Sequence, residues 1–161
     1  TGRMLALFAG GATHATGIDR SPEMLRLARA KLDGAAIELR QGDIGALPLE
    51  AASADTIILH QVLHYLPAPE AAIAELARIL APGGRVLIVD FASHDLEELR
   101  DRDAHARLGF SDDQISGWCA AAGLDYAAVE SLAGHTLTVK IWCGAKPATA
   151  ATLPNLKVVS A

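Results

Sequence analysis

The strand-to-helix junction at Gly17-Ile18-Asp19-Arg20-Ser21-Pro22-Glu23-Met24 constrains the fold of this chain more than any other segment. Residues 15–19 form a short apolar run that predicts a strand ending in a carboxylate. Ser21 predicts a helix cap, and Pro22 fits the first helical turn, where its missing N–H costs nothing. Apolar residues then recur at helical spacing, and Gly34 predicts the stop. A strand that leads directly into a helix is typical of a βαβ unit.

Strand and helix patterns alternate along the rest of the chain. The expected strands cover residues 36–40, 54–59, 85–91, 124–131 and 136–143. The expected helices cover residues 69–80, 94–103 and 112–122. Strand ends that lead into helices indicate a parallel sheet, whereas the short connection between the last two strands indicates an antiparallel hairpin. The predicted fold class is therefore α/β.

Several residues predict where helices begin and end. Pro69 opens one helix, and Pro82-Gly83-Gly84 predicts its end. Ser111 and Gln114 have the spacing of a capping box at the start of the last helix, and Gly123 predicts its end.

Composition limits the class of protein. The 161 residues are the size of one domain, and 51% of them are apolar, enough for a sizeable core. The net charge is −5 without a basic run, which disfavours direct contact with nucleic acid. No apolar stretch approaches the ~20 residues of a membrane helix, and Cys119 and Cys143 form no zinc pattern. We expect a cytoplasmic domain over residues 1–146 with reduced thiols, and a tail or linker over residues 147–161.

Two acids at expected strand ends indicate the ligand. Asp19 ends the first strand, and Asp43 lies in Gly42-Asp43-Ile44 after the second. A carboxylate can accept both hydroxyls of a ribose, and ligands of open parallel sheets lie outside the carboxyl ends of the strands. The pair suits a nucleoside, and S-adenosylmethionine is the cofactor that we expect. The alternatives are a solvated acid at Asp19 and, at Asp43, a loop acid that caps its own backbone.

These features together resemble the class I S-adenosylmethionine-dependent methyltransferases over residues 1 to about 146. That family has a Rossmann-like sheet ordered 3-2-1-4-5-7-6, with helices on both faces and strand 7 antiparallel. The expected terminal hairpin looks like its strands 6 and 7. Residues 17–24, 60–66 and 94–110 resemble, more narrowly, the methyltransferase domain fused to metal-sensing winged-helix (ArsR-type) repressors. An upstream repressor domain is the partner that this narrower resemblance implies.

The sequence departs from the family at its start. The family begins with a central strand that runs into an acidic residue and a glycine-rich turn, but Thr1-Gly2-Arg3 resembles only the last step of that turn. A central strand cannot be lost without exposing two rows of backbone N–H and C=O groups. We therefore expect a preceding segment to supply the first strand.

The resemblance also implies roles for particular residues in the cofactor site. Asp19 would accept from the ribose, and Gly2 would allow close backbone approach. Asp43 would accept from the adenine amino group, and Ile44 would donate its backbone N–H to a ring nitrogen. Met24 would pack on the adenine face, or else belong to the core. The expected cofactor site is Gly2, Asp19, Arg20, Met24, Asp43, Ile44, His60 and Gln61.

Histidines indicate where the methyl acceptor would lie. His60 follows a buried strand and could act as a base, since histidine titrates near neutral pH, or could bond to backbone and shape the pocket. The expected substrate contacts are His64, Tyr65, His94 and His105. His94, Asp95 and His105 could also bind a metal, but adjacent helical residues point about 100° apart, so no metal site is predicted.

The sequence thus predicts S-adenosylmethionine-dependent methyl transfer to an acceptor that we expect to be a small molecule, with no membrane contact. A homo-oligomer is compatible with this function. One alternative is a non-catalytic domain that senses S-adenosylmethionine, because a fold alone does not establish catalysis. The other is an NAD-dependent oxidoreductase, which the second acid at Asp43 and the terminal hairpin disfavour.

Overall fold

A computed structural model describes residues 2–32 and 37–148. Gly34, Ala36 and residues 149–161 of the expected tail lie outside the described residues. The elements in chain order are α1 (Arg3–Phe8), η1 (Ala9–Gly11), β1 (Ala15–Asp19), α2 (Pro22–Lys31), β2 (Ile37–Gln41), β3 (Ala54–His60), η2 (Leu63–Tyr65), α3 (Pro69–Ile79), β4 (Leu80–Phe91), α4 (Glu98–Asp103), α5 (Asp112–Ala121), β5 (Asp125–Ala133) and β6 (Thr138–Ala145).

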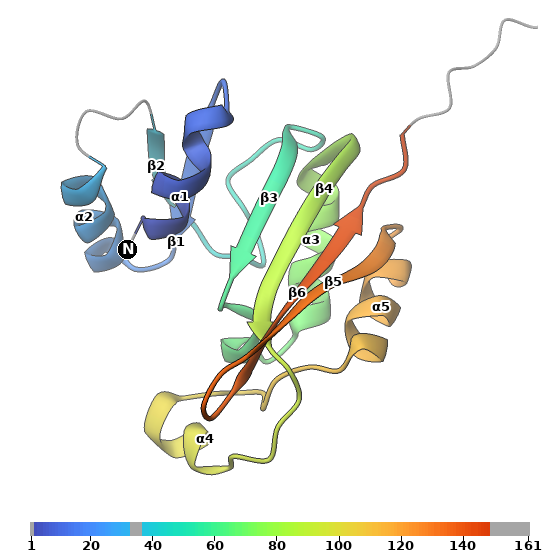
Figure 1. Ribbon diagram of the computed structural model, residues 1–161. Coiled ribbons are helices and arrows are strands. Elements are labelled where there is room, and N and C mark those ends of the chain that lie inside the picture. Colours follow the sequence, from blue (N-terminus) through green and yellow to red (C-terminus); the bar gives the residue numbers. More distant parts are fainter. Residues whose placement is uncertain (1, 33–36, 149–161) are drawn as a thin grey trace, which may run out of the picture.

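The strands form two sheets (Figure 1). β1 and β2 pair in parallel, with Asp19 opposite Gln41. The second sheet has the order β3-β4-β6-β5, in which β3 is parallel to β4 and β6 is antiparallel to both of its neighbours. Within the described residues, β1 and β3 each have one hydrogen-bonded neighbouring strand. This order is that of the resembled family without its first strand, and it confirms the α/β class and the terminal hairpin.

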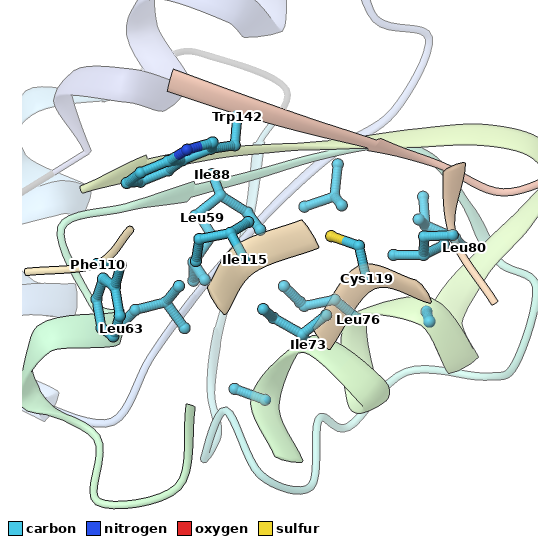
Figure 2. Packing of buried hydrophobic residues seen from close by; sticks show 14 of the residues in the cluster. Leu59, Leu63, Ile73, Leu76, Leu80, Ile88, Phe110, Ile115, Cys119 and Trp142 are labelled. Carbon is cyan, nitrogen blue, oxygen red and sulfur yellow. The ribbon is translucent and has the colours of Figure 1, made fainter. Parts of the chain in front are cut away.

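The core lies between the four-stranded sheet and the two helices α3 and α5, which pack together on one face of it (Figures 1 and 2). Alternate β4 residues Val86, Ile88 and Asp90 are fully buried, as expected for one face of a strand. Trp142 of β6 is also fully buried and lies among the same apolar side chains. None of the helices in residues 2–32 and 37–148 has the length and apolar character that crossing a bilayer requires.

The expected helix over residues 69–80 is confirmed to within one residue, whereas the strand after it begins earlier than the expected residue 85. The helix ends at Ile79, and the Pro-Gly-Gly segment belongs to β4. Lys146 Nζ donates to the carbonyl oxygens of Ala77 and Leu80 at 2.8 Å each and so satisfies acceptors at the helix end.

The helix expected over residues 94–103 is shorter than predicted and begins at Glu98. The preceding backbone bonds elsewhere, because Ser93 N donates to Phe110 O and His94 N donates to Leu108 O, both at 3.1 Å. These long-range bonds hold residues 93–94 in an extended connection. The capping box of α5, by contrast, is confirmed, since Ser111 and Gln114 exchange both expected hydrogen bonds.

We expect Cys119, on the buried face of α5, to resist alkylation in the folded protein. Burial raises the pKa of its thiol to about 11, and the thiolate is the reactive form. Iodoacetamide at pH 8 should label Cys119 at least about 100-fold more slowly in the native protein than in urea. Peptide mass spectrometry on a Cys143→Ser background measures this rate. Equal labelling in both states would contradict the packing of α5 against the sheet.

Candidate functional site

Asp19 occupies the carboxyl end of β1, and its position follows from the local sequence. Ser21 N donates to Asp19 Oδ1 at 2.8 Å, and Met24 N donates to Ser21 Oγ at 3.3 Å, which caps α2. One carboxylate oxygen is thereby fixed by the turn. The other, Oδ2, has no hydrogen-bond partner among the described residues. The side chain is thus held in place and keeps acceptor capacity for a ligand.

A small pocket beside Asp19 is bordered by the start of α1. It is lined by Gly2, Leu5, Gly17, Ile18, Asp19, Met24, Leu25, Ala28 and Leu39. Gly2 has a φ of 74°, and a Cβ there would lie 3.0 Å from Leu32 Cδ1. A Cβ on Gly17 would overlap Leu5 and lie 2.8 Å from Leu39 Cδ2. Gly2 therefore lets the start of α1 approach α2, and Gly17 lets α1 approach β1 next to the carboxylate.

Asp43 lies after β2, beside the end of β1, because Gly42 N donates to Asp19 O at 3.2 Å. Its Oδ1 accepts from Gly45 N at 2.8 Å, and its carbonyl accepts from Ala46 N at 3.1 Å. The alternative in which Asp43 caps its own loop backbone is therefore observed, but for only one of its two carboxylate oxygens. Its Oδ2 has no partner within the described part of the chain, so ligand contact is still open to it.

A second, largely apolar pocket contains Asp43 and Ile44 but not Asp19. It is lined by Asp43, Ile44, Gly45, Leu66, Pro67, Ala68, Ala71 and Ala72. The structure thus brings the two acids to neighbouring strand ends, as the sequence predicts, but places them in separate pockets. A ligand that contacts both must extend from one pocket to the other. Arg20 is exposed beside the first pocket, and its carbonyl accepts from Gln41 Nε2 at 3.1 Å.

His60 and Gln61 lie at the carboxyl end of β3. Gln61 N donates to Val89 O at 2.7 Å, and Gln61 has a φ of 52°, a left-handed conformation that is uncommon outside glycine. The chain therefore turns sharply as it leaves the strand. His60 is half-buried, and no hydrogen bond of its side chain is found among the described residues. The alternative of a backbone-bonded histidine is thus not observed here.

His64 forms a buried pair with Asp90, which sequence reasoning missed. His64 Nδ1 lies 2.7 Å from Asp90 Oδ1, and the two residues are 1% and 0% exposed. Asp90 also accepts from Leu63 N at 3.0 Å and from Phe91 N at 2.8 Å. A carboxylate can only accept hydrogen bonds, so His64 Nδ1 is the donor of this pair. The sequence feature that could have pointed to this pair was Asp90, an acid in a mostly apolar strand.

The remaining expected substrate residues gather around this pair. The His105 ring lies 4.3 Å from the His64 ring and 5.6 Å from Tyr65, centroid to centroid, and stacks on Phe91 at 5.7 Å. Burial, followed by the proximity of His64, lowers the pKa of His105. Its Nδ1 and the Nε2 of His94 are buried without partners among the described residues.

Asp95, which the sequence analysis considered together with His94 and His105, is exposed and does not join the histidine group. In residues 2–32 and 37–148, no three His, Cys, Asp or Glu side chains converge as metal ligation requires. The group is a polar and aromatic cluster beside the carboxyl ends of β3 and β4, in which His64 and His105 are buried and Tyr65 is exposed.

Two parallel strands with an acid at or just after their carboxyl ends, beside a glycine that opens a helix, are typical of the Rossmann-like nucleoside-binding class. A family model described as "Methyltransferase domain" matches residues 1–88. The chain belongs to this family of methyltransferase domains, whose cofactor is S-adenosylmethionine. The broad resemblance seen in the sequence is confirmed, whereas the narrower one to repressor-fused domains stays a prediction.

Relatives of known name agree with this family. An arsenite methyltransferase of Halobacterium salinarum is 39% identical over 80 residues, 48% of this chain and 20% of that protein. A malonyl-[acyl-carrier protein] O-methyltransferase of Hahella chejuensis is 31% identical over 120 residues, 71% of this chain and 43% of that protein. The chain thus spans less than half the length of these relatives. The YcgJ protein from Bacillus subtilis has the same fold, with a TM-score of 0.78 at 18% identity, over 89% of this chain and 86% of that one.

Proposed function

We propose that this chain is the catalytic domain of an S-adenosylmethionine-dependent methyltransferase that acts on a small molecule. The observation that carries the proposal is Asp19, whose Oδ1 is fixed by Ser21 N while Oδ2 stays available in a pocket with Gly2 and Met24. Relatives named as arsenite and demethylmenaquinone methyltransferases support a small acceptor. They differ in chemistry, so they support no particular acceptor.

The residues present fit the cofactor. Asp19 would accept from the ribose hydroxyls, and Gly2, which lines the same pocket and has no side chain, would let the backbone approach the cofactor. Asp43 Oδ2 accepts from the adenine amino group, Ile44 N–H donates to the ring, and the apolar pocket wall covers the base. Arg20 and Met24 flank the ribose side, and the backbone at His60 and Gln61 holds the ammonium group. When bound, S-adenosylmethionine supplies a methyl group on an already activated sulfonium.

Because the methyl group is already activated, the side chains of this protein need only a small chemical role. They align the acceptor and exclude water. His60 removes a proton only from an acceptor that arrives protonated, a contribution of about 10²–10⁴-fold. His64, Tyr65, His94 and His105 form the acceptor side.

Calorimetry with the full-length protein tests this proposal. S-adenosylmethionine should bind with a Kd in the micromolar range, and NAD should not bind at the same concentrations. Binding of NAD alone would support the oxidoreductase and refute the proposal. Tight binding of S-adenosylmethionine without turnover of any amine, thiol, phenol or arsenite acceptor would instead support a sensing domain.

A further inference from the structure

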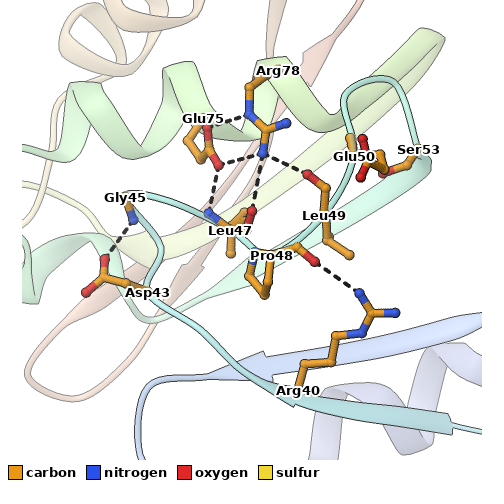
Figure 3. A network of polar contacts seen from close by, with 10 residues as sticks. All are labelled: Arg40, Asp43, Gly45, Leu47, Pro48, Leu49, Glu50, Ser53, Glu75 and Arg78. Carbon is orange, nitrogen blue, oxygen red and sulfur yellow. Dashed lines mark hydrogen bonds and ion pairs between the residues drawn. The ribbon is translucent and has the colours of Figure 1, made fainter.

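The loop between β2 and β3 is tied to α3 by side chains of that helix (Figure 3). Leu47 N donates to Glu75 Oε1 at 2.7 Å. Arg78 Nη2 donates to Leu49 O at 3.0 Å and, more weakly, to Leu47 O at 3.4 Å. Side chains of one helix therefore satisfy a backbone N–H and two backbone carbonyl oxygens of the loop, which fixes the loop in position.

Glu75 and Arg78 also bond to each other, so they act as one unit. Arg78 Nε lies 2.8 Å from Glu75 Oε2, and Nη2 lies 2.7 Å from Oε1, a two-point contact between the guanidinium and the carboxylate. Arg78 holds the pKa of the Glu75 carboxyl below its ordinary value. We call this pair, with its bonds to Leu47 and Leu49, the loop clamp.

The loop clamp holds the residues that follow the turn carrying Asp43. Residues 43–46 form a closed turn, through the bonds from Gly45 N and Ala46 N to Asp43, and Leu47 follows at once. The same helix α3 contributes Ala71 and Ala72 to the pocket that contains Asp43 and Ile44. Helix α3 therefore sets both the apolar wall of that pocket and the position of its polar edge.

We propose that Glu75 and Arg78 are positioning residues that give the pocket its selectivity for a 6-aminopurine base. They do so by holding the turn at Asp43 and Ile44 at a fixed distance from the pocket wall on α3. This inference rests on the proposed function, in which Asp43 and Ile44 contact adenine. Neither Glu75 nor Arg78 needs to touch the ligand.

General stabilisation alone does not account for the clamp. The Arg78 side chain is 39% exposed and that of Glu75 is 14% exposed, and ion pairs with an exposed partner contribute little to the stability of a fold. Arg102 and Asp103 form a more exposed ion pair on α4, 2.9 Å apart, without bonds to a neighbouring loop. The distinguishing feature of the clamp is its three bonds to the loop backbone.

Two ligands that differ only at the base test the inference. S-adenosylhomocysteine has the 6-amino group, whereas S-inosylhomocysteine has a 6-oxo group that cannot donate to Asp43. By calorimetry, the full-length protein should prefer S-adenosylhomocysteine by at least about 10-fold. Arg78→Met should lower this preference by about 3- to 10-fold, mainly by weakening the 6-amino ligand. Arg102→Met is the matched control and should leave the preference unchanged.

The outcomes separate the inference from the function on which it rests. Asp43→Ala should abolish the preference, and if it does not, the adenine role of Asp43 in the proposed function fails, and the inference with it. If Asp43→Ala abolishes the preference but Arg78→Met leaves it intact, the clamp inference alone is overturned. Should Arg78→Met fail to fold, Glu75→Gln decides, with a drop of about 2- to 5-fold expected and an unchanged preference overturning the inference.

Discussion

Replacing Asp19 with Ala should weaken the binding of S-adenosylmethionine by about 1.5–3 kcal/mol, which is about 10- to 150-fold in Kd. The reason is that its Oδ2 is the acceptor proposed for both ribose hydroxyls, and hydrogen bonds to a charged group are the stronger ones. Calorimetry at fixed ionic strength measures the change. The unfolding midpoint, measured in parallel, shows whether the variant is folded.

Two further variants isolate the charge of Asp19 from its local structural role. Asp19→Asn keeps an oxygen for Ser21 N and should lose an intermediate amount of affinity, because the amide accepts more weakly. Glu23→Gln removes an exposed acid from the first turn of α2 and should leave the affinity within about twofold. Unchanged affinity in Asp19→Ala would refute the ribose role and support the alternative, in which Asp19 is only a solvated acid at the end of a strand.

The fold could be predicted from the sequence where the signals are local. Apolar periodicity placed β1, β3, α3 and the terminal hairpin, and the Ser111–Gln114 spacing placed the cap of α5. The prediction failed where a distant residue decides. The bonds from residues 93–94 to residues 108–110 keep the first expected helical turn extended.

The candidate site shows the same division. Asp19 and Asp43 could be found because each lies at a strand end marked by its own neighbours. Their separation into two pockets depends on how α1 and α3 pack, which no local pattern encodes. Asp90 was missed because its partner, His64, comes from another segment. The spacing of two residues in sequence says nothing about whether a tertiary contact joins them.

Asp90→Ala should lower the free energy of unfolding by about 3–5 kcal/mol, the largest stability effect that we expect for the site. Removing the carboxylate leaves His64 Nδ1, Leu63 N and Phe91 N without their acceptor in a fully buried position. Urea unfolding followed by circular dichroism measures the change. Asp103→Ala, which removes an exposed acid from the nearby α4, should change stability by no more than about 0.5 kcal/mol.

A double variant shows how much of that loss belongs to the pair itself. In His64→Leu with Asp90→Leu, both buried polar side chains are replaced by apolar ones, which is often close to neutral for a buried pair. Two backbone N–H groups still lack an acceptor, however, so we expect the double variant to be more stable than Asp90→Ala but less stable than the wild type. A loss below about 1 kcal/mol in Asp90→Ala would mean that water reaches this pair. In that case the histidine group could not exclude water from the methyl acceptor, because water would already reach Asp90 beneath it.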